Sequence, residues 1–239
     1  MRFSPRSFLS LALVLCSCFF TGCGFANNTM KRHYLSSAKK FAAEGKWREA
    51  TLQYLNALRL QPGSAEARYG LAKLAQQQGD YTTARQQFQA TVDLVPGNLD
   101  AQLQLGVLML QAGEVENSRK QADLVLAKEP NNADAHLLQA QIDAATGKMD
   151  DAQREIQKAL ELAPQSSAPY VVIAAIRLRA NDPEGAANAY RKAIELDPKQ
   201  SAILLNLGSR TPMCHHIELN QLLLRVSFPE RFAFDVVKA

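Results

Sequence analysis

The chain has 239 residues, with 27 basic and 23 acidic side chains and a formal net charge of +4 at pH 7. Two of the basic residues and none of the acidic ones precede residue 23, so the rest of the chain carries about +2 (25 − 23). A chain this close to neutral, without a basic stripe, is not expected to bind nucleic acid.

Residues 1–22 have the pattern of a secretory signal peptide. Arg2 and Arg6 precede an apolar run over residues 8–20, which is shorter than the ~20 residues that a membrane-spanning helix needs. Cys23 follows this segment, and the sequence Phe-Thr-Gly-Cys at residues 20–23 resembles the bacterial lipoprotein box. In that family the cysteine is lipidated and becomes the mature N-terminus. The alternatives are an ordinary signal peptide with a chance cysteine, or a short anchor.

The lipoprotein resemblance also implies a location. In that family an aspartate after the cysteine is the usual signal for retention in the inner membrane, and here Gly24 follows Cys23. We therefore expect a mature protein on the periplasmic face of the outer membrane, held by acyl chains that contribute ~0.8 kcal/mol per buried CH₂. Residues 23–30 are expected to form a short tether.

Beyond the tether, one residue pattern recurs every 34 residues (96 − 62 = 34). Prolines, small residues, larger residues and glycines each keep this spacing, and a fixed period of this length predicts helix–turn–helix units that stack into a solenoid. The recurring residues are Pro62, Pro96, Pro130, Pro164 and Pro198; Ala50, Ala84, Ser118, Ala152 and Ala186; Tyr54, Phe88, Ala122, Ile156 and Tyr190; and Gly45, Gly79, Gly113, Gly147 and Asn181.

These residues resemble the tetratricopeptide repeat (TPR) family. The resemblance covers five units, at residues 31–64, 65–98, 99–132, 133–166 and 167–200, and a sixth unit begins at Ser201 and breaks after Gly208. It implies an all-α fold over residues 31–208, a right-handed superhelical solenoid of antiparallel helix pairs. Below, each residue's position in its unit is counted from the first residue of that unit.

The local sequence favours the same helix pairs. The first helix of a unit is rich in alanine and leucine, for instance residues 101–112, and a glycine follows that can adopt the left-handed conformation of a helix end. The second helix follows, for instance residues 150–163. Small residues at positions 8, 20 and 27 allow the two backbones to approach closely, and the proline lies just past the second helix.

Residues 209–239 lose the register, and two explanations stay open. In the first, the segment is a native cap, because Leu219, Leu222, Leu223 and Val226 follow the i, i+3, i+4, i+7 spacing of one helix face. In the second, the gene is interrupted and the segment is translated out of frame, because the sixth unit stops abruptly.

No residue pattern in the chain predicts catalysis, a cofactor or a metal site. The sequence contains no phosphate-binding loop, nucleophile elbow or pair of carboxylates in a plausible cleft. His136 occupies position 4, where the family packs an aromatic residue, so we expect a half-buried structural histidine. The triplet Cys214-His215-His216 is a weak metal candidate because no further ligands lie at metal-binding spacing. We expect the protein not to be an enzyme.

The resemblance places a candidate binding groove on the first helices of the units, at positions 2, 5, 9 and 12. We expect its N-terminal third to be mixed and basic and the remainder to be aliphatic, solvent-facing and suited to an amphipathic helix or apolar peptide. The alternative is that some of these residues pack on the neighbouring helix. The candidate groove residues are Leu35, Lys39, Tyr69, Lys73, Leu103, Val107, Leu110, Leu137, Gln141, Val171 and Leu178.

Two hypotheses about function follow. In the first, the protein is a scaffold anchored to the outer membrane that binds other proteins during envelope assembly or secretion, for example of pili or exopolysaccharide. In the second, it is the N-terminal fragment of a longer TPR protein whose effector or enzymatic region is missing.

Overall fold

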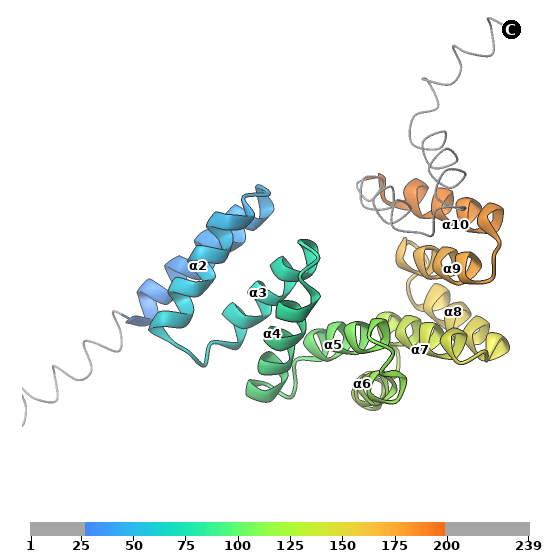
Figure 1. The fold of residues 1–239 in the computed structure, drawn as a ribbon, viewed down its shortest axis with the longest axis horizontal. Coiled ribbons are helices and arrows are strands. Elements are labelled where there is room, and N and C mark those ends of the chain that lie inside the picture. The colour runs from blue at the N-terminus through green and yellow to red at the C-terminus, as the bar shows by residue number, and fades with distance from the viewer. Residues whose placement is uncertain (1–26, 199–239) are drawn as a thin grey trace, which may run out of the picture. The chain divides into compact units, whose positions relative to one another are not determined.

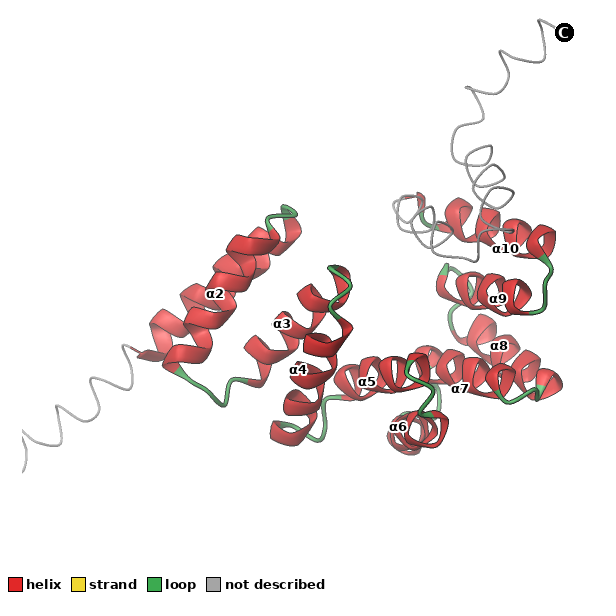
Figure 2. Cartoon of the chain, in the orientation of Figure 1, coloured by secondary structure: helices red, strands yellow, loops and turns green. Residues whose placement is uncertain are grey.

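The structure, a computed structural model, describes residues 27–198 (Figure 1). The predicted signal peptide, the lipidation candidate Cys23, the sixth unit, the Cys214-His215-His216 triplet and residues 209–239 lie outside this range. Within it the chain is helical, with short turns and no strand (Figure 2). Residues 27–30, which were expected to belong to the tether, are helical and continue into the first helix, through residue 43.

Nine helices follow that first helix within the described range, two to a unit from α3 onward. Their bounds are α2 Trp47–Leu60, α3 Ala65–Gln77, α4 Tyr81–Leu94, α5 Leu99–Gln111, α6 Val115–Lys128, α7 Ala133–Ala145, α8 Met149–Leu162, α9 Ala168–Arg179 and α10 Pro183–Leu196. The expected helices at 101–112 and 150–163 correspond to α5 and α8, each displaced by one or two residues.

The most extensive packing joins the two helices of one unit: α3 with α4, α7 with α8, and α9 with α10. The described residues divide into two compact parts, with the boundary between Leu105 and Gly106, inside α5. In each part successive helices are joined by turns of a few residues. The predicted all-α fold of helix pairs is confirmed.

Glycine ends the first helix of four units, as the sequence predicts. Gly45, Gly79, Gly113 and Gly147 have φ between 72° and 79°, and Asn181 takes the same role in the fifth unit with φ 59°. Glycine adopts this left-handed conformation without the steric cost of a Cβ, and asparagine tolerates it better than most residues. The chain reverses there into the second helix of the unit.

Alanine at position 20 lies where the two helices of a unit come closest. Ala50 and Ala84 are fully buried, and the aromatic residue one turn later, Tyr54 or Phe88, is 5% or 0% exposed. Packing between the first and second units is also close, because a Cβ added at Gly70 of α3 would overlap the Tyr54 ring of α2. The expected arrangement of small residues beneath a larger one is therefore confirmed.

The fifth unit begins differently from the second and fourth. Ser64 and Asn132 have extended backbones, and their side chains accept hydrogen bonds from the first turns of α3 and α7. Ser167, before α9, is in the right-handed helical region and makes no such bond, and Pro169 follows it within the first turn. The start of α9 therefore lacks the side-chain cap that α3 and α7 have.

Candidate functional site

Four of the predicted groove residues are buried, and the expectation that they face solvent is wrong. Leu35, Leu103, Leu110 and Leu137 are 4–8% exposed. Leu137 belongs to a cluster with Ile156 of α8 and Val172 of α9. Leu35 lies in the corresponding cluster of the N-terminal part. These side chains therefore contribute to packing between helices, which is the alternative that the sequence left open.

The polar members of the predicted groove are accessible in the N-terminal part. Lys39 Nζ lies 2.6 Å from Glu66 Oε1, with both side chains more than half exposed. The hydrogen bond and the charge of Glu66 raise the pKa of Lys39, although an ion pair this exposed contributes little stability. Lys73 Nζ lies 5.8 Å from the centre of the Tyr69 ring, which meets Phe88 edge-on. Lys39 and Lys73 are exposed on this surface, and its use as a binding groove stays a prediction.

The other predicted groove residues are partly covered. Val171 and Leu178 of α9 pack against the buried cluster around Tyr190 of α10. Val107 and Gln141 are half-buried. The C-terminal part therefore does not present a continuous aliphatic groove along its first helices.

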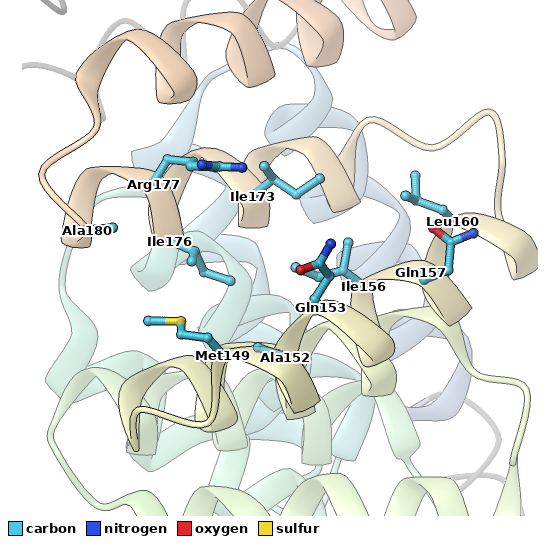
Figure 3. A pocket seen from close by; sticks show the side chains of 10 residues that line it. All are labelled: Met149, Ala152, Gln153, Ile156, Gln157, Leu160, Ile173, Ile176, Arg177 and Ala180. Carbon is cyan, nitrogen blue, oxygen red and sulfur yellow. The ribbon is translucent and has the colours of Figure 1, made fainter.

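An apolar pocket lies instead between α8 and α9 (Figure 3). Its volume is about 420 Å³, and side chains from both helices point into it from opposite sides. The lining residues are Met149, Ala152, Gln153, Ile156, Gln157 and Leu160 of α8, with Ile173, Ile176, Arg177 and Ala180 from α9 and its end.

The pocket lies where α8 and α9 pack less extensively than α2 with α3 or α6 with α7, the equivalent pairs in earlier units. The altered start of α9 at Ser167 and Pro169 accompanies this loosening. Sequence reasoning missed the pocket because Ile156 and Ile173 occupy ordinary packing positions. The one residue that could have indicated a different start of α9 was Pro169, the third residue of the fifth unit.

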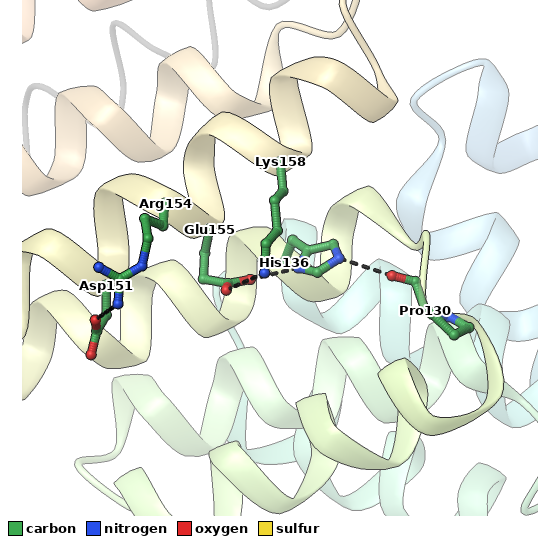
Figure 4. Close-up of polar contacts among 6 residues, drawn as sticks. All are labelled: Pro130, His136, Asp151, Arg154, Glu155 and Lys158. Atoms are coloured by element: carbon green, nitrogen blue, oxygen red, sulfur yellow. Dashed lines mark hydrogen bonds and ion pairs between the residues drawn. The ribbon is translucent and has the colours of Figure 1, made fainter.

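His136, in α7, joins that helix to α8 and to the turn that precedes α7 (Figure 4). Its Nε2 lies 2.9 Å from the Pro130 carbonyl oxygen, which can only accept, so this nitrogen donates. Its Nδ1 lies 2.6 Å from Glu155 Oε2, and Lys158 Nζ donates to the other carboxylate oxygen at 2.9 Å. With 8% exposure, His136 has the structural role expected from its position in the unit.

The Glu155 carboxylate is the electrostatic centre of this network. Burial acts to raise its pKa, but the hydrogen bonds and charges of Lys158 and His136 outweigh that effect and leave the pKa below its ordinary value of 4.5. The network ties α7, α8 and the preceding turn together.

The described residues contain neither a candidate metal site nor a candidate membrane-spanning helix. Between residues 27 and 198, no three His, Cys, Asp or Glu side chains are grouped so that they could hold a metal ion. None of the helices in that range is both long and apolar enough to cross a bilayer.

Comparison with known proteins agrees with the repeat pattern. Three tetratricopeptide repeat models match the chain, over residues 75–142, over residues 35–99 and 173–209, and over residues 133–166. No curated protein sequence matches the chain.

Solved structures share the fold. TTC0263, a TPR protein from Thermus thermophilus, has a TM-score of 0.60 and 21% identity, covering 81% of this chain and 99% of its own. MamA from Desulfovibrio magneticus RS-1, from residue 41 to its end, has a TM-score of 0.55 and 21% identity, covering 72% of this chain and 97% of its own. YrrB, a TPR protein with an unusual peptide-binding site, has a TM-score of 0.50 and 19% identity, covering 69% of this chain and 85% of its own. At these identities the likeness concerns the fold alone.

The Glu155 network predicts a pH-dependent contribution to stability. Because the pKa of Glu155 is lowered by folding, its contribution is present above its ordinary pKa of 4.5 and is lost as the pH falls through the lower native value. We expect Glu155→Gln to lower the free energy of unfolding by roughly 1–3 kcal/mol at pH 7. The difference from the unsubstituted protein should shrink below about pH 4.5. Urea unfolding between pH 7 and pH 3 measures the loss of free energy at pH 7 and its decrease at lower pH.

Glu161→Gln, which removes an exposed carboxylate from the same helix, is the control and should change the free energy of unfolding little at pH 7. A gap between the Glu155→Gln variant and the unsubstituted protein that stays constant down to pH 3 would contradict this account of the network.

Proposed function

The chain belongs to the tetratricopeptide repeat family, and from this premise we propose that it is a scaffold that binds protein partners in the bacterial envelope. Helix pairs stacked in this way expose long faces without forming a catalytic cleft, which suits them to hold extended or helical segments of other proteins. The observation that carries the proposal is the apolar pocket between α8 and α9.

The pocket has the size and chemistry to take apolar side chains of a partner. Its volume of about 420 Å³ falls in the range of ~300–1,000 Å³ that is usual for binding pockets. Ile156, Ile173 and Ile176 supply apolar walls, and burying apolar surface on them contributes about 25 cal/mol per Å². Pockets that are mostly apolar with a few polar groups fix both affinity and orientation.

Polar groups at the pocket set the direction of the bound segment. Arg177 lines it, and its Nη1 donates to Asp182 Oδ2 at 3.2 Å, with the Arg177 side chain 57% exposed. Gln153 and Gln157 bring amide groups to the pocket from the opposite helix, α8. We infer that the partner inserts aliphatic or aromatic side chains of an amphipathic helix or apolar peptide and places a polar or acidic group towards Arg177. YrrB supports this use of the fold, because it has a peptide-binding site.

The location in the envelope is inferred from the N-terminal sequence. The signal-peptide pattern before Cys23 and the glycine after it support lipidation at that cysteine and attachment to the periplasmic face of the outer membrane. A scaffold held there reaches partners in the periplasm, such as those of envelope assembly or secretion.

Blocking the pocket should abolish partner capture. Gln157→Trp places an indole over the pocket from an exposed position, whereas Gln89→Trp makes the same change at position 25 of the second unit. The two glutamines are matched, since each is exposed and donates to an acidic residue one turn later, Glu161 or Asp93. In pull-downs from envelope extract, Gln157→Trp should lose the captured partners and Gln89→Trp should keep them. Equal capture by both variants would exclude the pocket.

Lipidation is tested separately at Cys23. A Cys23→Ser variant should remain an unprocessed precursor that does not incorporate labelled palmitate, because serine lacks the thiolate that accepts the lipid. Normal processing and normal membrane fractionation of this variant would show that the anchor is not at this residue.

A further inference from the structure

The outer face of α2 differs from the same face of every later second helix. Arg48, Leu52, Leu55 and Arg59 recur at i, i+4, i+7 and i+11, so they form one stripe along the helix, which we call the outer stripe. Leu52 and Leu55 are 56% and 51% exposed, and both arginines are exposed. The stripe lies opposite the buried face of α2, formed by Ala50, Tyr54 and Ala57.

The 34-residue period provides an internal comparison. At the two leucine positions the later units have only polar or charged side chains, and at the two arginine positions they have no basic residue. The equivalents, all exposed, are Gln86, Lys120, Arg154 and Asn188 for Leu52; Gln89, Asp123, Gln157 and Arg191 for Leu55; Thr82, Glu116, Asp150 and Glu184 for Arg48; and Asp93, Ala127, Glu161 and Glu195 for Arg59. An exposed pair of leucines is therefore not a requirement of the fold.

The net charge also differs between the first helix pair and the later units. Residues 27–60 contain seven basic and two acidic side chains, a net charge of +5 (7 − 2). Residues 61–198 contain thirteen basic and eighteen acidic side chains, a net charge of −5 (13 − 18). The first helix pair alone is therefore suited to an anionic surface.

We propose that the outer stripe of α2 docks on an anionic phospholipid membrane. Leucines on one face of a helix, flanked by arginines, suit a helix that lies in the headgroup region of a bilayer. Arginine can extend its charged group to the phosphates while its aliphatic stem stays beside the leucines. Each basic residue near an anionic surface contributes about 1 kcal/mol. The stripe is about 16 Å long, at 1.5 Å per residue.

The position of α2 in the chain favours a membrane over an acidic protein as the occupant. Asn27, in the first helix, is four residues after Cys23, so their Cα atoms are at most about 14 Å apart. Lys31 Nζ donates to Gln61 Oε1 at 2.7 Å, which places the Arg59 end of α2 beside the start of that helix. This step rests on the lipid anchor proposed for Cys23; the stripe and the charge do not depend on it.

The test uses residues 24–239, made without the signal and without Cys23 so that no lipid is attached. Trp47, the only tryptophan of the chain, opens α2 and is 38% exposed, so its emission reports contact with lipid. We expect a blue shift and co-sedimentation with vesicles of phosphatidylethanolamine and phosphatidylglycerol, weaker at 300 mM than at 50 mM salt. Phosphatidylcholine vesicles should bind much less.

Two variants separate the apolar and the charged contributions. Leu52→Gln with Leu55→Gln introduces the residues that the second unit has at these positions, and should weaken binding at least tenfold. Arg48→Gln with Arg59→Gln should weaken it about thirtyfold at low salt, from ~1 kcal/mol for each arginine. Leu124→Gln on α6 removes a leucine that is 48% exposed and should leave binding unchanged. Unchanged urea midpoints show that the variants remain folded.

Three results would overturn the proposal: no binding to phosphatidylglycerol vesicles, equal binding to phosphatidylcholine, or binding that neither double variant weakens. If the stripe captures an acidic protein but the chain does not bind vesicles, the first of these results applies and the proposal is overturned. Palmitate labelling at Cys23 separates this inference from the proposed anchor. Binding of the unacylated chain to vesicles supports the inference even if Cys23 carries no lipid, and an acylated protein whose unacylated form ignores vesicles overturns the inference alone.

Discussion

The close approach of the two helices within each unit is the contact on which the rest of the structure depends. Ala84 and Ala186 are fully buried where the backbones meet, and larger side chains such as Phe88 fill the space beside them. The left-handed residue at the end of the first helix sets the direction of the second. Because these few positions define a unit, the remaining positions are free to differ from one unit to the next.

That freedom explains where the two proposed binding surfaces lie in this chain. Leu52 and Leu55 give α2 an apolar outer face where the other units are polar. The fifth unit begins with a different turn at Ser167, and a pocket lies between its first helix, α9, and the preceding helix, α8. Both features are departures from the repeat at positions that the packing of helix pairs does not fix. A chain held at a membrane through its first unit would leave its later units to meet partners.

The helices, their order and their buried small residues could be predicted from the sequence, because the period of 34 fixes one local solution repeated five times. The burial of the predicted groove residues could not be predicted from the sequence. Leu103 and Leu137 are aliphatic at positions that the family leaves open, and only coordinates show that neighbouring helices cover them. The pocket depends on how far α9 stands from α8, a tertiary distance that no local pattern encodes. His136 was predictable, since its position within the unit is a packing position.

The most direct test of partner binding is a photo-crosslinking amino acid placed at position 157, beside the α8–α9 pocket, and at position 89, its equivalent in the second unit. The crosslinks are made in living cells and resolved by mass spectrometry. Binding in the pocket predicts adducts to one or a few other proteins from position 157, through their apolar segments, and none from position 89. The same adducts from both positions, or none from position 157, would contradict it.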